Sequence, residues 1–358
     1  MKNKVIAFTK YSKLGASSRM RTYNYSKYLD GLLILPLFDD DYIKCLYSGE
    51  RVKKIKVFWF YMRRFCQLLW VSLFSKRTII WIEKELFPYV PFNLNYILKL
   101  RGNYLVYDYD DAVYVNYSNL ALSCLFKKKF ESIAKSSDII FCGNPNIKGF
   151  FDAIGADETI ILPTVIDIGK YDKFYKNKKT EAQESITIGW IGTPNTQKYL
   201  VLVDDAISKL QVKYPNKINF TLIGASKSLN LKSKVDLVNW SDETEAECIS
   251  LFDIGIMPLP DSEFERGKSG YKIIQYMALG IPVLASPVGV NTVLVNNEEN
   301  GYLCETEFDW IKNLDRLISD INHRNELGEN GRKQIKSVYT YDANYQIICE
   351  SFETLLQH

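Results

Sequence analysis

The sequence predicts an α/β protein with two Rossmann-like, doubly wound parallel-sheet domains that face a cleft, and a C-terminal helix. Three observations lead to this prediction. The chain has 358 residues, which is enough for about two domains. Short, continuously apolar runs alternate with longer segments of helical periodicity, as in parallel sheets that helices cover on both faces. This alternation stops once, at a polar stretch, and then starts again.

The first half of the chain shows this alternation clearly. We predict strands at its apolar runs, residues 5–8, 32–37, 78–82, 104–108, 138–142 and 159–162. Segments with helical periodicity lie between them, near 18–30, 51–75, 92–101, 119–136 and 144–154. We therefore assign residues 1–170 to an N-terminal domain.

Residues 171–185 are polar and charged, and their apolar residues follow no period, which indicates an interdomain linker. The alternation then returns, with expected strands at 186–191, 219–224, 235–240, 253–257 and 282–285 and helices near 198–213, 242–251, 269–279, 307–320 and 323–338. Residues 186–341 form the predicted second domain, and 342–358 contain a last helix.

The composition excludes several classes of protein. With 45 Lys and Arg against 42 Asp and Glu, the net charge of +3 is too balanced for a dedicated nucleic-acid binder. The two histidines, His323 and His358, lie near the C-terminus, so a histidine base in the N-terminal half and a multi-histidine metal site are excluded. The seven cysteines form no C-x-x-C pair, and we expect reduced thiols in a cytoplasmic protein. We expect neither a signal peptide nor a membrane-spanning segment.

In open parallel sheets, ligands bind beyond the carboxyl ends of the strands, and four segments at such ends carry polar residues. The first follows the strand at 5–8. Gly15 allows a close approach of the backbone, and Arg19 and Arg21 offer donors for phosphate or sugar. The alternative is a strand–helix turn with a surface arginine pair. The segment lacks G-x-G-x-x-G, which disfavours a dinucleotide cofactor.

The second segment places Asp108, Asp110 and Asp111 at a strand end. Carboxylates this close repel one another unless each has a partner. We expect Asp110 and Asp111 to bind sugar hydroxyls, with a Mg²⁺ site and capping of a helix or loop as the alternatives.

The third segment follows the strand at 186–191. Gly192 permits a close backbone approach, Thr193 offers a hydroxyl and Lys198 could reach a phosphate. The alternative is a proline-containing turn with a solvated Lys198.

The fourth segment contains a cationic turn into a helix. We predict that Arg266, Lys268 and Lys272 bind a diphosphate together with free backbone N–H groups near the helix start. The expected contacts of the donor in this segment come from Arg266, Lys268, Ser269, Gly270, Tyr271, Lys272 and Gln275. A solvated basic helix start is the alternative, and a P-loop is disfavoured because Ser262 stands where that motif needs glycine.

Residues 51–77 hold eight basic residues and no acidic residue. On a helix, Lys53, Lys56, Arg63 and Arg64 cluster on one side, whereas apolar residues that include Phe65 and Leu68 cluster on another. This pattern suits an anionic membrane surface. The alternative is a long domain helix with one core face and one solvated face.

The fourth segment reads R-G-K-x-x-x-K-x-x-Q-Y-M-A-x-G-x-P-V-x-x-S-P-V-G from Arg266 to Gly289. With 188–301 and 108–114, it resembles GT-B glycosyltransferases of the retaining family 4, or group 1, type, in a bacterial subgroup for surface polysaccharides. The resemblance implies a nucleotide-sugar donor, by default a UDP-sugar, on the second domain and a glycan or polyprenyl-diphosphate-linked acceptor on the first. It also implies that the helix in 342–358 crosses back onto the first domain. The family pattern has glutamates where Gly267 and Gln275 stand, and an arginine at Thr193.

A retaining transfer needs no protein base if the departing phosphate oxygen takes the acceptor proton on the same face of the sugar. We therefore expect Lys268, Lys272, Asp110 and Asp111 to be the catalytic residues, with no essential metal and no cofactor. A sugar-nucleotide epimerase and a non-catalytic nucleotide-sugar-binding protein of the same fold remain alternatives.

Overall fold

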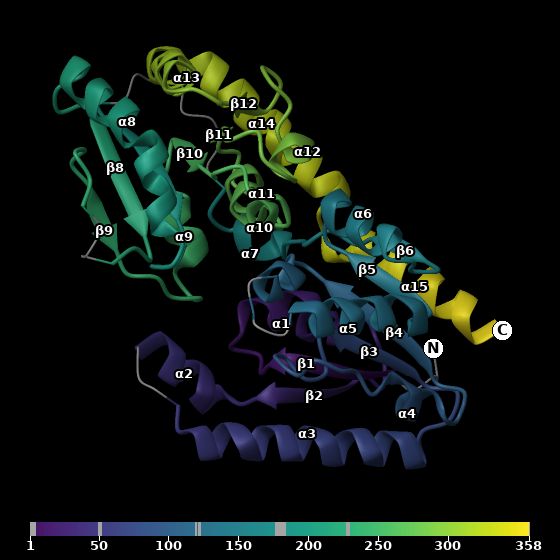
Figure 1. The fold of residues 1–358 in the computed structure, drawn as a ribbon. Helices are drawn as coiled ribbons and strands as arrows, with labels where there is room; N and C mark the ends of the chain where they lie inside the picture. Colours follow the sequence, from purple (N-terminus) through teal and green to yellow (C-terminus); the bar gives the residue numbers. More distant parts are fainter. Residues whose placement is uncertain are drawn as a thin grey trace. The chain divides into compact units, whose positions relative to one another are not determined.

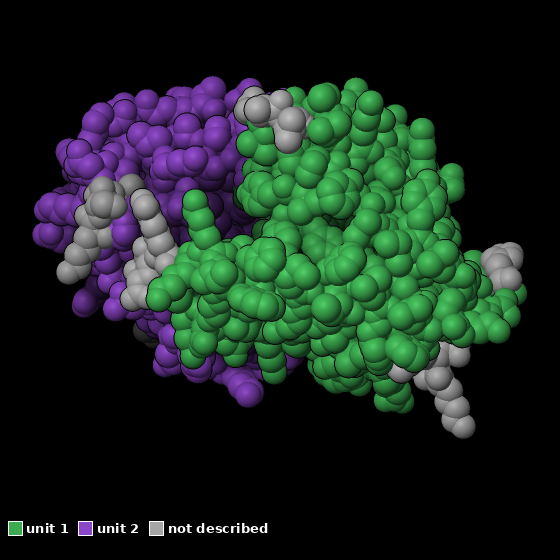
Figure 2. All heavy atoms as spheres, turned by 60° about the horizontal axis from the view of Figure 1, so that its bottom comes forward, with its two compact units in different colours: residues 1–164, 267–269, 344–358 green, residues 165–266, 270–343 purple. Residues whose placement is uncertain are grey.

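The computed structural model describes residues 5–48, 52–118, 120, 123–175, 184–226 and 230–357. Within them the chain divides into two compact units, which Figure 2 colours separately. Unit 1 comprises residues 1–164, 267–269 and 344–358, and unit 2 comprises 165–266 and 270–343. Each unit has its own sheet and its own hydrophobic core.

Unit 1 is built on a six-stranded parallel sheet with the order β2-β1-β3-β4-β5-β6 (Figure 1). Its strands are β1 (Val5–Tyr11), β2 (Leu33–Phe38), β3 (Ile79–Glu83), β4 (Tyr104–Tyr109), β5 (Ile139–Cys142) and β6 (Thr159–Ile161). All six predicted strands are confirmed, with ends that differ by a few residues. Their apolar side chains are buried on both faces of the sheet, as expected for a parallel sheet.

The helices of unit 1 are α1 (Ala16–Arg21), α2 (Asp40–Ser48), α3 (Lys54–Phe74), α4 (Asn95–Lys99), α5 (Ser123–Ser136), α6 (Pro145–Ala153) and α15 (Tyr341–Gln357), with 3-10 turns η1 (Tyr23–Lys27) and η2 (Val113–Tyr117). The sequence reading missed α2. The residues that favour a helix start here are close together in the chain. Asp39 accepts a hydrogen bond from the Tyr42 backbone, and acidic residues occupy the first turn.

The two faces of the first sheet are covered by different helices. On one face, Leu68 and Val71 of α3 pack with Phe8 and Ile80. On the other face, Phe352 of α15 meets the ring of Trp81 edge-on at 5.8 Å. The C-terminal helix therefore packs on the sheet formed by the N-terminal half of the chain.

Unit 2 contains a second six-stranded parallel sheet, ordered β12-β11-β10-β7-β8-β9. Its strands are β7 (Ile186–Ile191), β8 (Ile218–Ile223), β9 (Asp236–Val238), β10 (Ile254–Met257), β11 (Val283–Ala285) and β12 (Gly301–Leu303). Five of them were predicted. The edge strand β12 was missed because its few apolar residues are too short a run to signal a strand.

The helical elements of unit 2 are α7 (Ile168–Asp172), η3 (Gln197–Leu200), α8 (Val201–Lys213), α9 (Glu245–Ile249), α10 (Glu263–Arg266), α11 (Tyr271–Ala278), α12 (Asn291–Leu294), α13 (Glu307–Ser319) and α14 (Ile321–Val338). Part of the segment that we expected to be a linker, 171–185, is ordered. Tyr171 of α7 is buried in the core of unit 2. Residues 176–183 of that segment lie outside the described residues.

The strand orders locate the point in each sheet where connections diverge to opposite sides. In the first sheet this point lies between β1 and β3, and in the second it lies between β7 and β10. Loops at the carboxyl ends of such a strand pair leave in opposite directions and open a crevice, where ligands bind in open α/β sheets. The loops after β1, β3, β7 and β10 are therefore where each unit is best shaped for a ligand.

Candidate functional site

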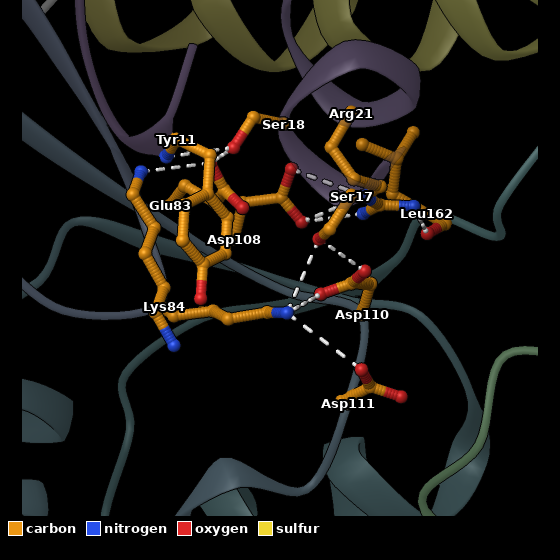
Figure 3. A network of polar contacts seen from close by, with 11 residues as sticks. Tyr11, Ser17, Ser18, Arg21, Glu83, Lys84, Asp108, Asp110, Asp111 and Leu162 are labelled. Atoms are coloured by element: carbon orange, nitrogen blue, oxygen red, sulfur yellow. Dashed lines mark hydrogen bonds and ion pairs between the residues drawn. The ribbon is translucent and has the colours of Figure 1, made fainter. Parts of the chain in front are cut away.

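In unit 1, the loops after β1, β3 and β4 bring together a group of charged side chains (Figure 3). Lys84 follows β3, and its ammonium lies 2.8 Å from a carboxylate oxygen of Asp110 and 3.7 Å from one of Asp111. Ser17 at the start of α1 donates to Asp110 at 2.5 Å, and Lys84 donates to Ser17 at 3.1 Å. The two aspartates that we predicted as catalytic therefore share one lysine.

The electrostatics of this group follow from burial and pairing. Burial alone would lower the pKa of Lys84, but Asp110 and Asp111 outweigh burial and raise it. Burial alone would raise the pKa of Asp110, but Lys84 and Arg21 reverse that effect and lower it to about 2. Lys84 and Asp110 are consequently charged together at neutral pH, and Asp111, whose side chain is 32% exposed, is the more accessible carboxylate.

A second buried ion pair, between Arg21 and Asp108, lies beside this group (Figure 3). The guanidinium of Arg21 contacts both carboxylate oxygens of Asp108 and donates to the Leu162 carbonyl at 2.7 Å. Burial raises the pKa of Asp108 to about 6 despite the attraction of Arg21. We had expected Arg21 to offer donors to a ligand, and the structure corrects this, because Arg21 is buried and bound within the protein.

The loop after β1 holds the other predicted residues of unit 1. Gly15 is required there by packing, since a Cβ at this position would lie 2.4 Å from the Cβ of Tyr11. Arg19 is half-buried on α1, and its backbone N–H donates to the Gly15 carbonyl at 2.8 Å. Glu83 at the end of β3 accepts from Ser18 at 2.6 Å and from the Lys10 backbone at 3.0 Å, which fixes the start of α1.

Sequence reasoning missed Glu83 and Lys84, although a signal was present. Charged residues directly follow the apolar strand β3, and strand ends are where polar residues gather in parallel sheets. Lys84 also has a φ of 59°, a left-handed conformation that residues with a side chain rarely adopt. The sequence alone could not show that conformation or the pairing with Asp110.

In unit 2, the ring of Trp190 joins two predicted residues. Trp190 lies in β7, and Lys272 of α11 places its ammonium 5.5 Å from the centre of the indole ring. Gly192 passes over the same ring, because a Cβ there would lie 2.3 Å from the ring carbons. The structure thus places a glycine backbone and a cation beside one aromatic surface at the end of β7.

The remaining residues of the β7 loop are more exposed. Thr193 caps a turn, with its carbonyl accepting from the Thr196 backbone at 2.9 Å. Lys198 lies in η3 with its ammonium 5.3 Å from the ring centre of Tyr199. The Tyr199 hydroxyl in turn donates to the buried carboxylate of Glu265, which also accepts from Ser262. Glu265 therefore points toward the β7 loop.

Packing around Tyr276 holds α11 at this end of the sheet. The Tyr276 hydroxyl accepts from the backbone N–H of Ile191 at 3.1 Å. Its ring covers Gly255 of β10, where a Cβ would lie 2.4 Å from the ring. One tyrosine thereby fixes α11 against β7 and β10, the strand pair at which the sheet diverges.

The other residues of the predicted cationic turn have separate surroundings. Arg266 is exposed and forms a two-point ion pair with Asp261, at 2.6 and 2.8 Å, which offsets the charge that we expected it to offer to a diphosphate. Gly270 begins α11 with a φ of 68°, and a Cβ there would clash with Leu294. Lys268 and Ser269 are half-buried and belong to unit 1.

Gln275 and Tyr271 belong to a buried hydrogen-bonded chain. The amide nitrogen of Gln275 donates to the Tyr171 hydroxyl at 2.9 Å, and Tyr171 donates to Glu245 at 3.0 Å. Tyr271 is hydrogen-bonded to Tyr171 as well. Because Gln275 is 2% exposed, its observed contacts link α11 to α7 and α9. Contacts of Gln275 with a ribose remain an expectation.

Metal ligands and membrane spans were also sought in the described parts of the chain. There, no group of three or more His, Cys, Asp or Glu side chains is arranged to hold a metal ion. Across the same residues, no helix combines the length and the apolar character needed to cross a bilayer.

Comparison with known proteins places this geometry in context. Residues 172–334 match the family model described as Glycosyl transferases group 1. This segment contains β7 to β12 with the Gly192, Lys198 and Lys272 site. No curated protein sequence matches the chain.

Several solved structures share the fold. Sucrose-phosphate synthase from Thermosynechococcus elongatus has a TM-score of 0.71 at 14% identity, covering 99% of this chain and 100% of that one. A glycosyltransferase from Rickettsia africae has a TM-score of 0.70 at 14% identity, with 100% of both chains covered. HepE from Anabaena, in complex with UDP and glucose, has a TM-score of 0.69 at 14% identity, covering 98% of this chain and 100% of that one.

These similarities show that the chain has the GT-B fold, as the sequence predicted. The family match adds that residues 172–334, most of unit 2, are similar to a group 1 glycosyltransferase domain.

Proposed function

We propose that this protein is a retaining glycosyltransferase that moves a hexose from a UDP-sugar to a glycan or polyprenyl-diphosphate-linked acceptor in the synthesis of a bacterial surface polysaccharide. The observation that carries the proposal is the site at the carboxyl end of β7. There Gly192, Trp190 and Lys272 lie within the segment that matches the group 1 family. Complexes of HepE with UDP and with UDP-glucose support UDP as the nucleotide.

In the proposed donor site, the backbone at Gly192 approaches the diphosphate closely, and Lys272 and Lys198 offset its charge. The face of an aromatic ring attracts a nearby ammonium group but carries no formal charge, so it does not replace a diphosphate as the ionic partner. Lys268, Ser269, Gly270 and Tyr271 remain proposed contacts through the segment that enters α11. Thr193 would add a hydroxyl. Arg266 would contact the donor only after breaking its ion pair with Asp261.

The proposed reaction breaks the bond between the anomeric carbon and the diphosphate oxygen. The acceptor hydroxyl oxygen forms the new bond on the same face of the sugar, and its proton passes to the departing phosphate oxygen. The products are UDP and the glycosylated acceptor. Lys272 and Lys268 would stabilise the charge that develops on the diphosphate, which is the largest contribution that such a site can make.

In unit 1, we propose that Asp111 binds hydroxyl groups of the acceptor or of the transferred sugar, because its carboxylate is partly exposed. Asp110 would act through its ion pair with Lys84, which holds the loop after β4 in place. Gly15 and Arg19 would border the same site from the β1 loop. The cell compartment that we propose is the cytoplasm, in keeping with seven free cysteines.

The first experiment is a thermal-shift screen of UDP-, GDP-, dTDP- and CMP-sugars. A ligand present at about 100 times its Kd stabilises the folded protein by about 2.7 kcal/mol. We expect UDP-sugars to raise the melting temperature and the others to leave it unchanged. Stabilisation by none of the four classes would refute the donor site.

The second experiment follows turnover with the UDP-sugar found by the screen. UDP release that requires an acceptor distinguishes a transferase from a non-catalytic binder, and a changed sugar in the nucleotide product would indicate an epimerase. The configuration of the product at the anomeric carbon, read by NMR, tests retention. Activity that survives EDTA treatment is expected, since we propose no essential metal, and an inverted product would contradict the mechanism.

A further inference from the structure

Helix α3 is apolar on two opposite sides. Its inner side packs on the first sheet through Phe60, Arg64, Leu68 and Val71, which are buried. Its outer side exposes large apolar side chains at helical spacing: Ile55, Phe58, Trp59, Met62, Phe65, Leu69, Trp70 and Leu73. A surface helix of a monomeric protein normally carries polar residues on the side away from the core. An exposed apolar face of this length indicates a surface that binds something.

The structure corrects the composition that the sequence predicted for this surface. Arg64, which we expected on a basic side, is 1% exposed and donates to the carbonyls of Thr9 at 2.7 Å and Leu35 at 3.0 Å. Leu68, which we expected on the outer apolar side, is fully buried. Trp59 is 65% exposed and lies on the outer face, one helical turn before Arg63.

A second element extends the apolar surface. Helix α4 packs against α3, and Arg101 donates to the Leu73 carbonyl at 3.0 Å, so the segment around α4 borders the C-terminal end of α3 (Figure 1). This segment exposes three more apolar side chains, Phe92, Tyr96 and Leu100, of which Tyr96 is 74% exposed. Here "the outer apolar face" means these three residues and the eight apolar residues of α3 named above. In Figure 2 the view is turned so that the α3 side of unit 1 comes forward.

The chain segments that form the outer apolar face carry basic side chains and no acidic ones, although Lys99 of α4 pairs with Asp138 from another segment at 3.0 Å. The sequence contains no acidic residue from 51 to 82 or from 86 to 107. Exposed cations lie at both ends of α3, with Lys53 and Lys54 at its start and Lys76 and Arg77 just beyond its end. Unlike these four cations, Lys56 has acidic neighbours, because its ammonium lies within 4 Å of the carboxylates of Asp39 and Asp41.

We propose that the outer apolar face docks on the surface of an anionic lipid bilayer. Apolar and aromatic side chains enter the boundary between headgroups and acyl chains, where tryptophan is favoured, and the flanking lysines contact anionic headgroups. A second copy of the chain fits less well. Two α3 helices packed face to face, in either direction, bring cationic ends against cationic ends, which is unfavourable.

The proposal goes beyond glycosyl transfer and does not depend on it. It is tested first by sedimentation of the full chain with vesicles of pure phosphatidylcholine and with vesicles containing 30 mol% phosphatidylglycerol. We expect binding to the anionic vesicles that weakens as salt increases. The variant F58Q/W59Q/L73Q should lose at least tenfold in affinity. Its control, V201Q/V212Q/F308Q, removes three apolar residues of unit 2 that are even more exposed, and it should bind like the wild type.

The charge contribution is tested by K53Q/K54Q/K76Q, with K217Q/K312Q/K333Q of unit 2 as the control. Each removed lysine should weaken binding to anionic vesicles by roughly fivefold at low salt, and the control should not. Cys66 is an exposed thiol between Met62 and Leu69. Its alkylation by a water-soluble maleimide should slow when anionic vesicles are added and not when neutral vesicles are added.

Circular dichroism and thermal melts confirm that each variant is folded before it is compared. Failure of the wild type to bind anionic vesicles even at low salt would overturn the proposal, as would equal losses in the apolar variant and its control. Concentration-dependent dimers that F58Q/W59Q/L73Q abolishes, without vesicle binding, would assign the face to a second copy instead. Binding of water-soluble UDP-sugars should be unchanged in all these variants, so a failure of docking is distinguishable from a failure of the proposed function.

Discussion

The two units place charge at the carboxyl ends of their strands in different ways. In unit 1, Lys84, Asp110, Arg21 and Asp108 are buried and neutralise one another in pairs. In unit 2, Lys272 and Lys198 lie over the rings of Trp190 and Tyr199. A buried ion pair holds its charges in fixed positions but offers little net charge to a ligand. An aromatic ring has no formal charge, so a cation beside it suits a diphosphate.

The comparison separates charges held in buried ion pairs from charges that lie beside aromatic rings. Removing one member of a buried pair leaves an uncompensated charge in the protein interior, so the cost falls on folding. Removing a cation that lies over a ring at the protein surface should cost little stability. If the donor site is correctly assigned, removing such a cation lowers the rate of the reaction or the affinity for the donor instead.

The largest expected effect is on the stability of Lys84→Met. Asp110 would remain buried without its cation, and we expect a loss of about 3–5 kcal/mol in the free energy of unfolding. Urea titration measures it. The double variant K84M/D110N should recover part of the loss, and Lys198→Met serves as a matched control from unit 2. Equal stabilities for the two single variants would remove the distinction between the units.

Next in size is the effect of Lys272→Ala on catalysis, which depends on the proposed function. Loss of a cation that stabilises the leaving diphosphate should lower kcat by about 10²–10³-fold. The melting temperature should change little. Lys272→Arg keeps a cation over Trp190 and should retain more activity than Lys272→Ala. An unchanged kcat in Lys272→Ala would refute the assigned role.

A smaller effect concerns the dependence of stability on pH. The pKa of Asp110 is about 2 in the folded protein, below its ordinary value of 3.8. Its carboxylate therefore stabilises the fold above about pH 4, and this contribution, on the order of 2 kcal/mol, is lost as the pH falls toward 2. The stability difference between the wild type and Asp110→Asn should shrink over that range. A difference that stays constant from pH 5 to pH 2 would contradict the ion pair.

The smallest expected effect is that of Lys198→Ala. Lys198 is exposed, and an exposed charge contact is worth less than about 1 kcal/mol, so KM for the UDP-sugar should rise by at most about fivefold. Stability should stay within about 0.5 kcal/mol of the wild type. Steady-state kinetics beside Lys312→Ala, an exposed lysine of α13, provide the comparison. A rise in KM far above that limit would show that Lys198 is enclosed in the donor complex.

The sequence was most informative where periodicity and burial coincide. Strands such as β7 and β4 are continuous apolar runs, and helices such as α13 have a clear apolar side, so both kinds of element could be predicted within a few residues. The long helix at 51–75 was predicted as well, but the side of it that packs on the sheet was not predicted correctly. Which residues face the sheet depends on the shape of the sheet, and this decided the burial of Arg64 and Leu68.

For the candidate site, too, part could be predicted from the sequence and part could not. The sequence by itself determined which residues follow the strand ends, because strand order along the chain follows from alternating apolar and helical segments. Only the tertiary structure decided their partners: Lys84 with Asp110, Arg21 with Asp108, Lys272 with Trp190 and Gln275 with Tyr171. These contacts join residues far apart in the chain, and their free energy depends on distances and burial that exist only after the sheets have formed.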